Sequence, residues 1–421
     1  MGTTRSIERR DFLRGLTGLG AMVAMAGGIK VARAATVERK FLFLFASGGW
    51  DTTYVFEPKI GASGVDMDPE ATLGQVGDLR YTAGERWAAV GRYFQRWGGV
   101  SCIVNGIDSH SVGHDSSTQF MLTGTSASSS PDWPTIIASH SAGDYPLPHI
   151  VLSGPSFPGN SGNTVVRGGG GVLFDLIDGQ ILGQSDEPAP LMAAPSMSMV
   201  DAFVQQRTAR YAATVGSSSG KARADGLLAA VERGMELKAR RYEANLTRSG
   251  GGLFDRAVVA LDAMRLGLCR TAMVTVGFGW DTHSGNQIQG DNFDSVFSDL
   301  DLLMEAMATT PGHSAPWLLD EVTLVVMSEF GRTPRSNGMG KDHWPYTSVL
   351  MAGSGVAGGR SLGYTDDGLV AQPVDYDTGE YDPAKSLLAS ENLGAAFLGM
   401  GGVDSNDYFP GILPFNAVRR S

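Results

Sequence analysis

Acidic and histidine side chains follow several short apolar segments of this chain, and side chains of these two kinds bind divalent metal ions. Ligands of open α/β sheets bind outside the carboxyl ends of the strands, so we expect these side chains to converge there. Carboxylates that lie close together repel one another and raise their own pKa values unless a cation neutralises them. The candidate metal ligands are Asp51, Asp281, His283, Glu329, Asp342 and His343.

This mixed set of carboxylates and imidazoles suits zinc, manganese, magnesium or iron rather than a metal that prefers thiolates. Asp281 and His283 are two positions apart, so in an extended segment both side chains project from the same side and could chelate one ion. Six candidates could serve one ion or two; two ions that share carboxylates would lie about 3.5–4 Å apart. A simpler interpretation stays open for Asp51, which could only cap the N-terminus of a helix.

Arg332 lies three residues after Glu329, where its guanidinium could bind an anionic substrate through two parallel hydrogen bonds. The alternative is an ion pair between Arg332 and one of the candidate carboxylates. Glycine is abundant, with 57 of 421 residues, about twice its ordinary share. Several glycines adjoin the candidate ligands, where they would let loops approach one another closely.

Continuous apolar runs alternate with helical patterns along the chain, which predicts an α/β fold with a mostly parallel central sheet flanked by helices. Residues 155–250 differ, with a glycine run, a proline-rich stretch and long charged helices. We expect one domain over residues 35–421, in which 155–250 is a helical insertion or cap. The predicted strands are 40–45, 100–104, 149–152, 271–278, 322–327 and 348–351, and the predicted helices are 84–97, 200–211, 222–245, 253–267 and 292–307.

The first 34 residues predict a twin-arginine export signal rather than part of the fold. Arg9 and Arg10 are followed by Phe-Leu, a weakly hydrophobic run over 15–29 and an A-x-A site at 32–34. The run is too short to span a bilayer, and no later stretch reaches ~18 uninterrupted apolar residues. We therefore expect a partner in the twin-arginine export machinery, a periplasmic or secreted location and no stable membrane span.

Charge argues against nucleic acid as a partner. The signal holds six of the 33 basic and two of the 44 acidic residues, so the remainder carries 27 basic against 42 acidic residues, a net charge of −15. Proteins that bind nucleic acid depend mainly on Lys and Arg to neutralise phosphates. The two cysteines, Cys102 and Cys269, could pair in an exported protein or remain buried thiols, and they are too few for a cysteine-rich zinc site.

Two motifs point to a family. Residues 277–287 (GFGWDTHSGNQ) resemble a GfDtHsnQ motif, and residues 328–334 (SEFGRTP) followed by 340–344 (GKDHW) resemble SEFGRTp…GtDHg. Together with the twin-arginine start and the Gly-Gly-Trp-Asp turn at 48–51, they resemble the exported bacterial proteins grouped as domain of unknown function 1501. That group is placed in the alkaline phosphatase and sulfatase superfamily. The resemblance covers most of residues 40–415 and implies an alkaline-phosphatase-like fold with the metal ligands named above, but no established substrate.

The same resemblance raises the question of the nucleophile. The superfamily places a Ser, Thr or modified Cys at the start of a helix after an early strand, and the corresponding position here is His114. The C-x-P-S-R signature is absent, so a formylglycine sulfatase is not expected. His114 could bind metal, act as general acid or base, or attack phosphorus directly, and His110 nearby could transfer protons. The alternative nucleophiles are Ser111, Ser116 and Ser117.

These observations predict an exported metal-dependent hydrolase that acts on a phosphate or sulfate ester, or a related group, of a small molecule or polymer. The alternative is an exported binding or assembly protein that keeps the fold and a metal ion but has no turnover. The absence of the superfamily nucleophile favours this alternative.

Overall fold

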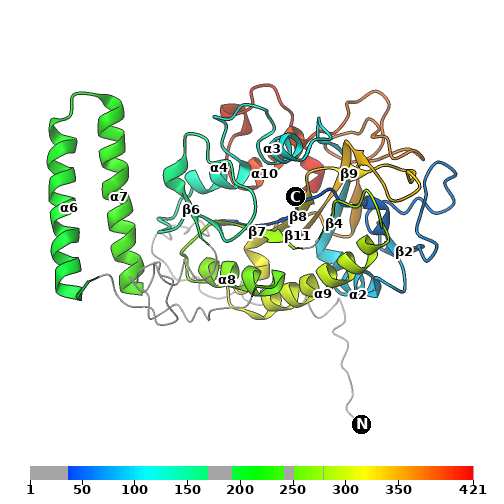
Figure 1. Cartoon of the computed structure of the whole chain (residues 1–421), viewed down its shortest axis with the longest axis horizontal. Coiled ribbons are helices and arrows are strands. Elements are labelled where there is room, and N and C mark those ends of the chain that lie inside the picture. The colour runs from blue at the N-terminus through cyan, green and yellow to red at the C-terminus, as the bar shows by residue number, and fades with distance from the viewer. Residues whose placement is uncertain (1–36, 169–191, 241–250, 278, 421) are drawn as a thin grey trace, which may run out of the picture. The chain divides into compact units, whose positions relative to one another are not determined.

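The computed structural model describes residues 37–168, 192–240, 251–277 and 279–420 (Figure 1). The predicted export signal and Phe278, at the end of one predicted strand, lie outside the described residues. Val37–Ser421 forms one compact unit by its internal contacts. Within the described parts of the chain, no helix is long and apolar enough to cross a membrane.

Eight strands form the central sheet in the order β12-β4-β11-β8-β1-β7-β5-β6. Neighbouring strands are parallel except at β11, which is antiparallel to both β4 and β8. The mostly parallel sheet is therefore confirmed, and all six predicted strand segments lie in it. The strands are β1 (Lys40–Ala46), β4 (Ser101–Asp108), β5 (His149–Val151), β6 (Val165–Arg167), β7 (Thr271–Val276), β8 (Val322–Ser328), β11 (Tyr346–Gly353) and β12 (Arg360–Leu362).

Helices cover both faces of this sheet, with α3, α4 and α10 on one face and α2, α8 and α9 on the other (Figure 1). Two further helices, α6 and α7, pack against each other and account for most of the described part of 155–250. That stretch also supplies edge strand β6, so it is not purely helical. The helices are α2 (Ala88–Trp97), α3 (His114–Thr123), α4 (Trp133–Ser139), α6 (Ala194–Thr214), α7 (Ser218–Arg240), α8 (Leu253–Arg265), α9 (Ile288–Thr309) and α10 (Ser390–Met400).

The central strand β1 supplies side chains to two separate hydrophobic cores, because successive residues of a strand point to opposite faces. Leu42 and Leu44 belong to the core under α8 and α9, whereas Phe41, Phe43 and Phe45 belong to the core under α4 and α10. All five side chains are fully buried. This two-sided burial is why the segment reads as a continuous apolar run.

Two antiparallel ribbons lie outside the main sheet. One pairs β2 (Thr72–Val76) with β3 (Leu79–Ala83), and the other pairs β9 (Gly331–Arg332) with β10 (His343–Trp344). The second ribbon joins two of the motifs identified in the sequence. Cys102 and Cys269 are both buried free thiols, and burial raises the pKa of each to about 12.

Removing a buried side chain of β1 from the core on the α4 side should destabilise the protein strongly. Phe43→Ala should lower the free energy of unfolding by about 3–5 kcal/mol, because it removes a fully buried ring and leaves a cavity. Leu302→Ala is the control, since Leu302 is 53% exposed on α9. Urea unfolding of both variants measures the difference. Costs that agree within about 1 kcal/mol would contradict the placement of β1 at the centre of the sheet.

Candidate metal centre

The sheet order brings the carboxyl ends of three strands together, because β8, β1 and β7 are neighbours. Ala46 at the end of β1 pairs with Val276 of β7 on one side and with Ser328 of β8 on the other. The residues that follow, including Ser47 and Glu329, therefore lie at one edge of the sheet. This is the edge at which open α/β sheets bind ligands.

Two more elements bring side chains to this edge. Strand β4 runs in the same direction as β8, because both are antiparallel to β11, and His114 begins the helix α3 that follows β4. The β9–β10 ribbon pairs Arg332 with His343. Residues distant in the sequence are thus positioned around the loop that carries Asp281.

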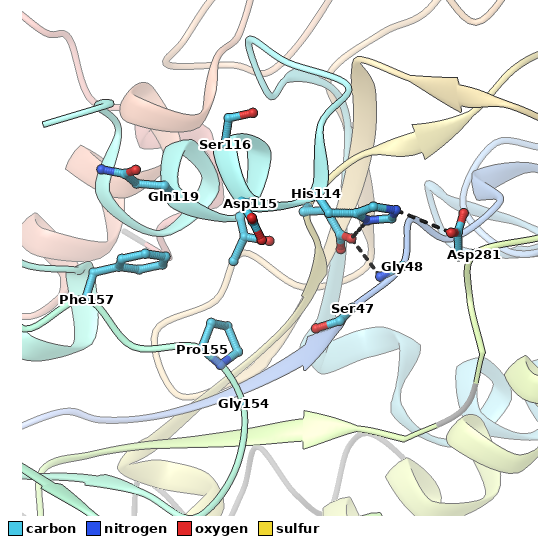
Figure 2. Close-up of a pocket in the computed structure, with 12 residues that line it drawn as sticks. Ser47, Gly48, His114, Asp115, Ser116, Gln119, Gly154, Pro155, Phe157 and Asp281 are labelled. Atoms are coloured by element: carbon cyan, nitrogen blue, oxygen red, sulfur yellow. Dashed lines mark hydrogen bonds and ion pairs between the residues drawn. The ribbon is translucent and has the colours of Figure 1, made fainter. Parts of the chain in front are cut away.

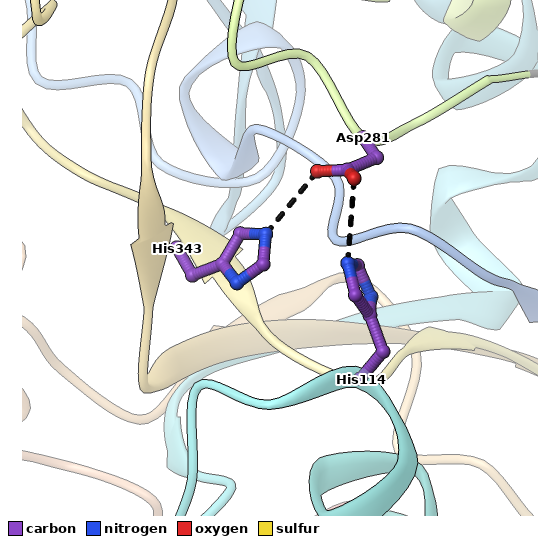
Figure 3. Close-up of side chains that lie close together, drawn as sticks. All are labelled: His114, Asp281 and His343. Atoms are coloured by element: carbon purple, nitrogen blue, oxygen red, sulfur yellow. Dashed lines mark hydrogen bonds and ion pairs between the residues drawn. The ribbon is translucent and has the colours of Figure 1, made fainter.

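Three imidazole rings converge on the Asp281 carboxylate. Figure 3 shows two of them, His114 and His343. The Nε2 atoms of His343 and His283 each lie 3.2 Å from Oδ1 of Asp281, and Nε2 of His114 lies 3.4 Å from Oδ2. The Nε2 atoms of His283 and His343 are only 2.9 Å apart. Candidate ligand atoms of His114, Asp281 and His343 all lie within 4.8 Å of one another and could hold one metal ion.

The other nitrogen of each ring has an oxygen partner. Nδ1 of His114 lies 2.8 Å from Oε1 of Glu329, Nδ1 of His283 lies 2.8 Å from Oδ1 of Asp342, and Nδ1 of His343 lies 2.7 Å from the Val112 carbonyl oxygen. Carbonyl and ionised carboxylate oxygens only accept hydrogen bonds, so each Nδ1 donates its proton. In the neutral rings, each Nε2 then carries a lone pair.

These lone pairs show that the site suits a cation. Two imidazole Nε2 atoms at 2.9 Å that both face a carboxylate oxygen repel one another unless a proton or a metal ion lies among them. Metal-bound histidines commonly donate their second nitrogen to a carboxylate or a carbonyl oxygen. Those are the partners of all three rings here, so the donor set fits a divalent metal ion.

Arg332 is completely buried and holds Asp281 in place. Its Nη2 donates to Oδ1 of Asp281 at 2.7 Å and to the Trp280 carbonyl oxygen at 3.0 Å, and it also contacts the Gly48 carbonyl oxygen. Its Nε donates to the Gly49 carbonyl oxygen at 2.7 Å. The structure therefore shows the alternative role, pairing with a site carboxylate, and a guanidinium with no exposed surface positions Asp281 rather than touching a substrate.

Asp281 remains ionised at neutral pH. Partial burial acts to raise its pKa, but the hydrogen bond and charge of Arg332, together with His343 and His114 when these rings are protonated, outweigh burial and lower the pKa to about 2. The carboxylate thus presents a full negative charge to the three imidazoles.

Glu329 is 1% exposed, and its carboxylate accepts the hydrogen bond that orients the His114 ring. Its Oε1 also accepts a hydrogen bond from the Gly48 backbone N–H at 2.7 Å, and its Oε2 accepts one from the Ser328 hydroxyl at 3.0 Å. Gly48 has a φ of +125°, and a Cβ there would lie 2.8 Å from the backbone nitrogen of Asp281. The expectation that glycine allows close approach at this site is confirmed at Gly48.

Asp51 stands apart from the imidazole cluster. Its carboxylate is fully buried and lies 2.8 Å from Nζ of Lys341, while it accepts hydrogen bonds from Thr53 and from Asn286. It caps the short 3₁₀ helix Thr52–Tyr54, as the simpler interpretation predicted. Lys341 was not among the predicted site residues, although a lysine inside the GKDHW motif is a natural partner for an acidic side chain.

Asp342 and His110 also lie outside the cluster of ligand atoms. Asp342 accepts hydrogen bonds from His283 and Asn337, and these bonds hold the pKa of its carboxyl below the ordinary value, so its contact with the site is through His283. His110 pairs through Nε2 with Oε2 of Glu391 at 2.8 Å. The chain therefore uses Asp342 to orient a ring, and it ties His110 to helix α10.

A pocket of about 800 Å³ opens beside the cluster (Figure 2). His114, Asp281 and Glu329 line it at one end, together with the exposed Ser47 at the end of β1. Of the three serines considered as nucleophiles, only Ser116 lines this pocket, and its hydroxyl is 2.7 Å from that of Ser111. Ser117 is fully buried. Ser47 was not among the candidates, although it lies two residues after the predicted strand 40–45 and directly follows β1.

Residues 38–409 match the family described as Protein of unknown function (DUF1501). The chain belongs to this family. No curated protein matches this DUF1501 chain.

Solved structures similar to the chain come from the alkaline phosphatase and sulfatase proteins. An alkaline phosphatase superfamily protein from Vibrio parahaemolyticus is 10% identical, with 91% of this chain and 71% of that chain covered and a TM-score of 0.35. A candidate sulfatase from Bacteroides thetaiotaomicron is 11% identical, with 87% and 71% covered and a TM-score of 0.32. At these TM-scores the likeness carries no conclusion about activity.

Removing one imidazole should abolish metal binding. We expect His343→Ala to weaken the affinity for Zn²⁺ or Mn²⁺ by more than 100-fold, because it deletes a ligand, and Glu329→Gln to weaken it about 10–100-fold through loss of the partner of His114. Equilibrium dialysis with elemental analysis gives the affinities. His140→Ala is the control, because the ring of His140 bonds to the Ile136 carbonyl oxygen of α4 and to the Tyr408 hydroxyl, away from the cluster. Unchanged metal content in His343→Ala would contradict this site.

The His110–Glu391 pair should make stability depend on pH. The hydrogen bond that His110 donates to Glu391 raises the pKa of His110 above 6.5, so this contribution is complete below pH 6.5 and disappears as pH rises through the folded-state pKa. Although burial acts to raise it, the pKa of Glu391 is lowered below 4.5 by His110, so that contribution is present above pH 4.5 and disappears as pH falls. The pair therefore stabilises most between pH 4.5 and 6.5.

We expect His110→Asn to lower the free energy of unfolding by about 0.5–1 kcal/mol at pH 5.5 and by less at pH 8.5. Asparagine is chosen because His110 has a φ of +60°, which asparagine tolerates. Urea unfolding at both pH values measures the loss. A loss as large at pH 8.5 as at pH 5.5 would show that the ion pair is not its cause.

Proposed function

We propose that this DUF1501 protein is a metal-dependent hydrolase that acts on a phosphate or sulfate monoester. The observation that carries the proposal is the convergence of three imidazole Nε2 atoms on one ionised carboxylate, with every Nδ1 donated to an oxygen atom. The residues that would hold the ion are His114, Asp281, His283 and His343. One ion is the simplest number for these ligands, and Asp51 would take part only in a second site.

A divalent ion in this position would polarise the ester and make bound water a better nucleophile. The chain's own residues then have separate tasks. Arg332 fixes Asp281, Glu329 and Asp342 fix the rings of His114 and His283, and the Val112 carbonyl fixes that of His343. His114 also lines the pocket, so it is the imidazole placed to meet a substrate. His110 is tied to Glu391, and its proposed proton role has no contact with the cluster to support it among the described residues.

The predicted export signal supports an extracytoplasmic location, with the twin-arginine machinery as the partner in export. The net charge of −15 after the signal supports the exclusion of nucleic acid.

The second candidate is an exported binding protein that holds a metal ion without turnover. The observation that favours it is His114 itself, because the position expected to carry a hydroxyl or thiol nucleophile carries an imidazole bonded to Glu329. In this candidate the pocket would bind an anionic ester and release it unchanged.

Hydrolysis assays on the full mature chain separate the two candidates. We expect the protein supplied with Zn²⁺ or Mn²⁺ to cleave an aryl phosphate or an aryl sulfate, and His114→Ala and His343→Ala to lose at least about 100-fold in kcat/KM. His140→Ala is the control histidine and should keep full activity. Metal binding without cleavage across aryl phosphate, phosphodiester and aryl sulfate would contradict the hydrolase and favour the binding protein.

A further inference from the structure

The pocket beside the metal centre has a second wall that the proposed reaction does not use. Helix α3 presents Asp115, Thr118 and Gln119 to it, and the loop after β5 presents Pro155 and Phe157. In Figure 2, Gln119 and Phe157 lie on the side of the pocket away from Asp281. This wall, defined by these five residues, is where the organic part of an ester would lie.

The polar side chains of this wall are free to bind a ligand. Asp115, Thr118 and Gln119 are spaced i, i+3 and i+4, so they share one face of α3. Within the described parts of the chain, none of the three side chains has a hydrogen bond or an ion pair. An amide and a hydroxyl both donate and accept hydrogen bonds, whereas a carboxylate accepts, and hydroxyl groups of a ligand can satisfy all of them.

The Phe157 ring faces this polar group from a fixed position. The Phe157 backbone N–H donates to Oδ2 of Asp132 at 2.6 Å, and its carbonyl oxygen accepts from the Asp132 N–H at 2.7 Å. Asp132 is fully buried and also caps α4. The backbone at Phe157 is therefore fixed, and its ring packs against the core on the α4 side. Less conformational freedom is then lost when a ligand packs on the ring.

Charge limits what can bind. No Lys or Arg is among the described residues that line the pocket, whereas Asp115 contributes an exposed carboxylate with no partner. A second anionic group on the substrate would lie near this carboxylate without a countercharge, and like charges repel. The wall therefore disfavours an organic part that carries a further negative charge.

From this combination we propose that the substrate is the monoester of a neutral, polyhydroxylated alcohol such as a sugar, with the ester as its one anionic group. Its hydroxyl groups would bond to Asp115, Thr118 and Gln119, and its C–H face would pack on Phe157. This inference rests on the proposed function, because it requires the ester to be held at the metal centre.

Calorimetric binding of matched ester pairs to the Zn²⁺-supplied full mature chain tests the inference. The probes are glucose 6-phosphate with hexyl phosphate, and glucose 6-sulfate with hexyl sulfate. We expect the sugar ester to bind at least about tenfold more tightly than the hexyl ester with the same head group. Gln119→Leu and Asp115→Leu should each remove most of this preference, because leucine keeps a similar volume and cannot hydrogen-bond. Gln75→Leu, on ribbon β2–β3 and outside the pocket lining, is the matched control and should retain it.

The possible failures are distinguishable. If none of the four esters binds, the proposed function fails along with the inference. If sugar and hexyl esters bind equally, or if Gln119→Leu and Asp115→Leu keep the full preference, the hydrolase proposal stands and the inference is overturned. Phosphocholine that binds more tightly than glucose 6-phosphate, with this advantage lost in Asp115→Asn, would also overturn it in favour of a cationic alcohol.

Discussion

The buried guanidinium of Arg332 connects the parts of the chain on which the site depends. Arg332 lies in β9, in the ribbon that follows β8. Its guanidinium donates to backbone carbonyl oxygens of Gly48 and Gly49 after β1 and of Trp280 after β7. Three neighbouring strand ends are thus tied to one side chain. A buried charge needs a full set of partners, and Asp281 supplies the opposite charge. The same ion pair that makes burial of Arg332 tolerable also fixes the carboxylate at the centre of the imidazole cluster.

The rest of the site has more hydrogen-bond acceptors and carboxylates than cations to balance them. Three imidazoles present lone pairs to Asp281, and Glu329 and Asp342 stand behind two of them. Arg332 is the one permanently charged cation in contact with Asp281 among the described residues, and Lys341 is occupied by Asp51. An arrangement this rich in acceptors is stable when a cation enters it. The fold therefore holds the ligands close together, and a metal ion would supply the missing charge.

Much of this arrangement could be predicted from the sequence. Strands with continuous apolar runs, such as β1 and β8, were found because both of their faces are buried. Strands β6 and β12 were missed because each has three residues that are mostly only partly buried, whereas the equally short β5 is fully buried and apolar enough to be found. Helix α10 was missed because nearly all of its residues are buried, which leaves no polar face. The motifs identified the side chains that meet at Asp281. Which carboxylate pairs with Lys341, and which carbonyl accepts a hydrogen bond from His343, depend on contacts between distant loops that a local pattern does not encode.

The most direct test of the metal centre is a crystal of the mature protein grown with Zn²⁺, with an anomalous difference map recorded at the zinc edge. We expect a peak within bonding distance of a carboxylate oxygen of Asp281 and of the Nε2 atoms of His283 and His343. Nε2 of His114 is the fourth expected ligand. A map with no peak among these atoms, or one in which zinc lies only elsewhere, would contradict it.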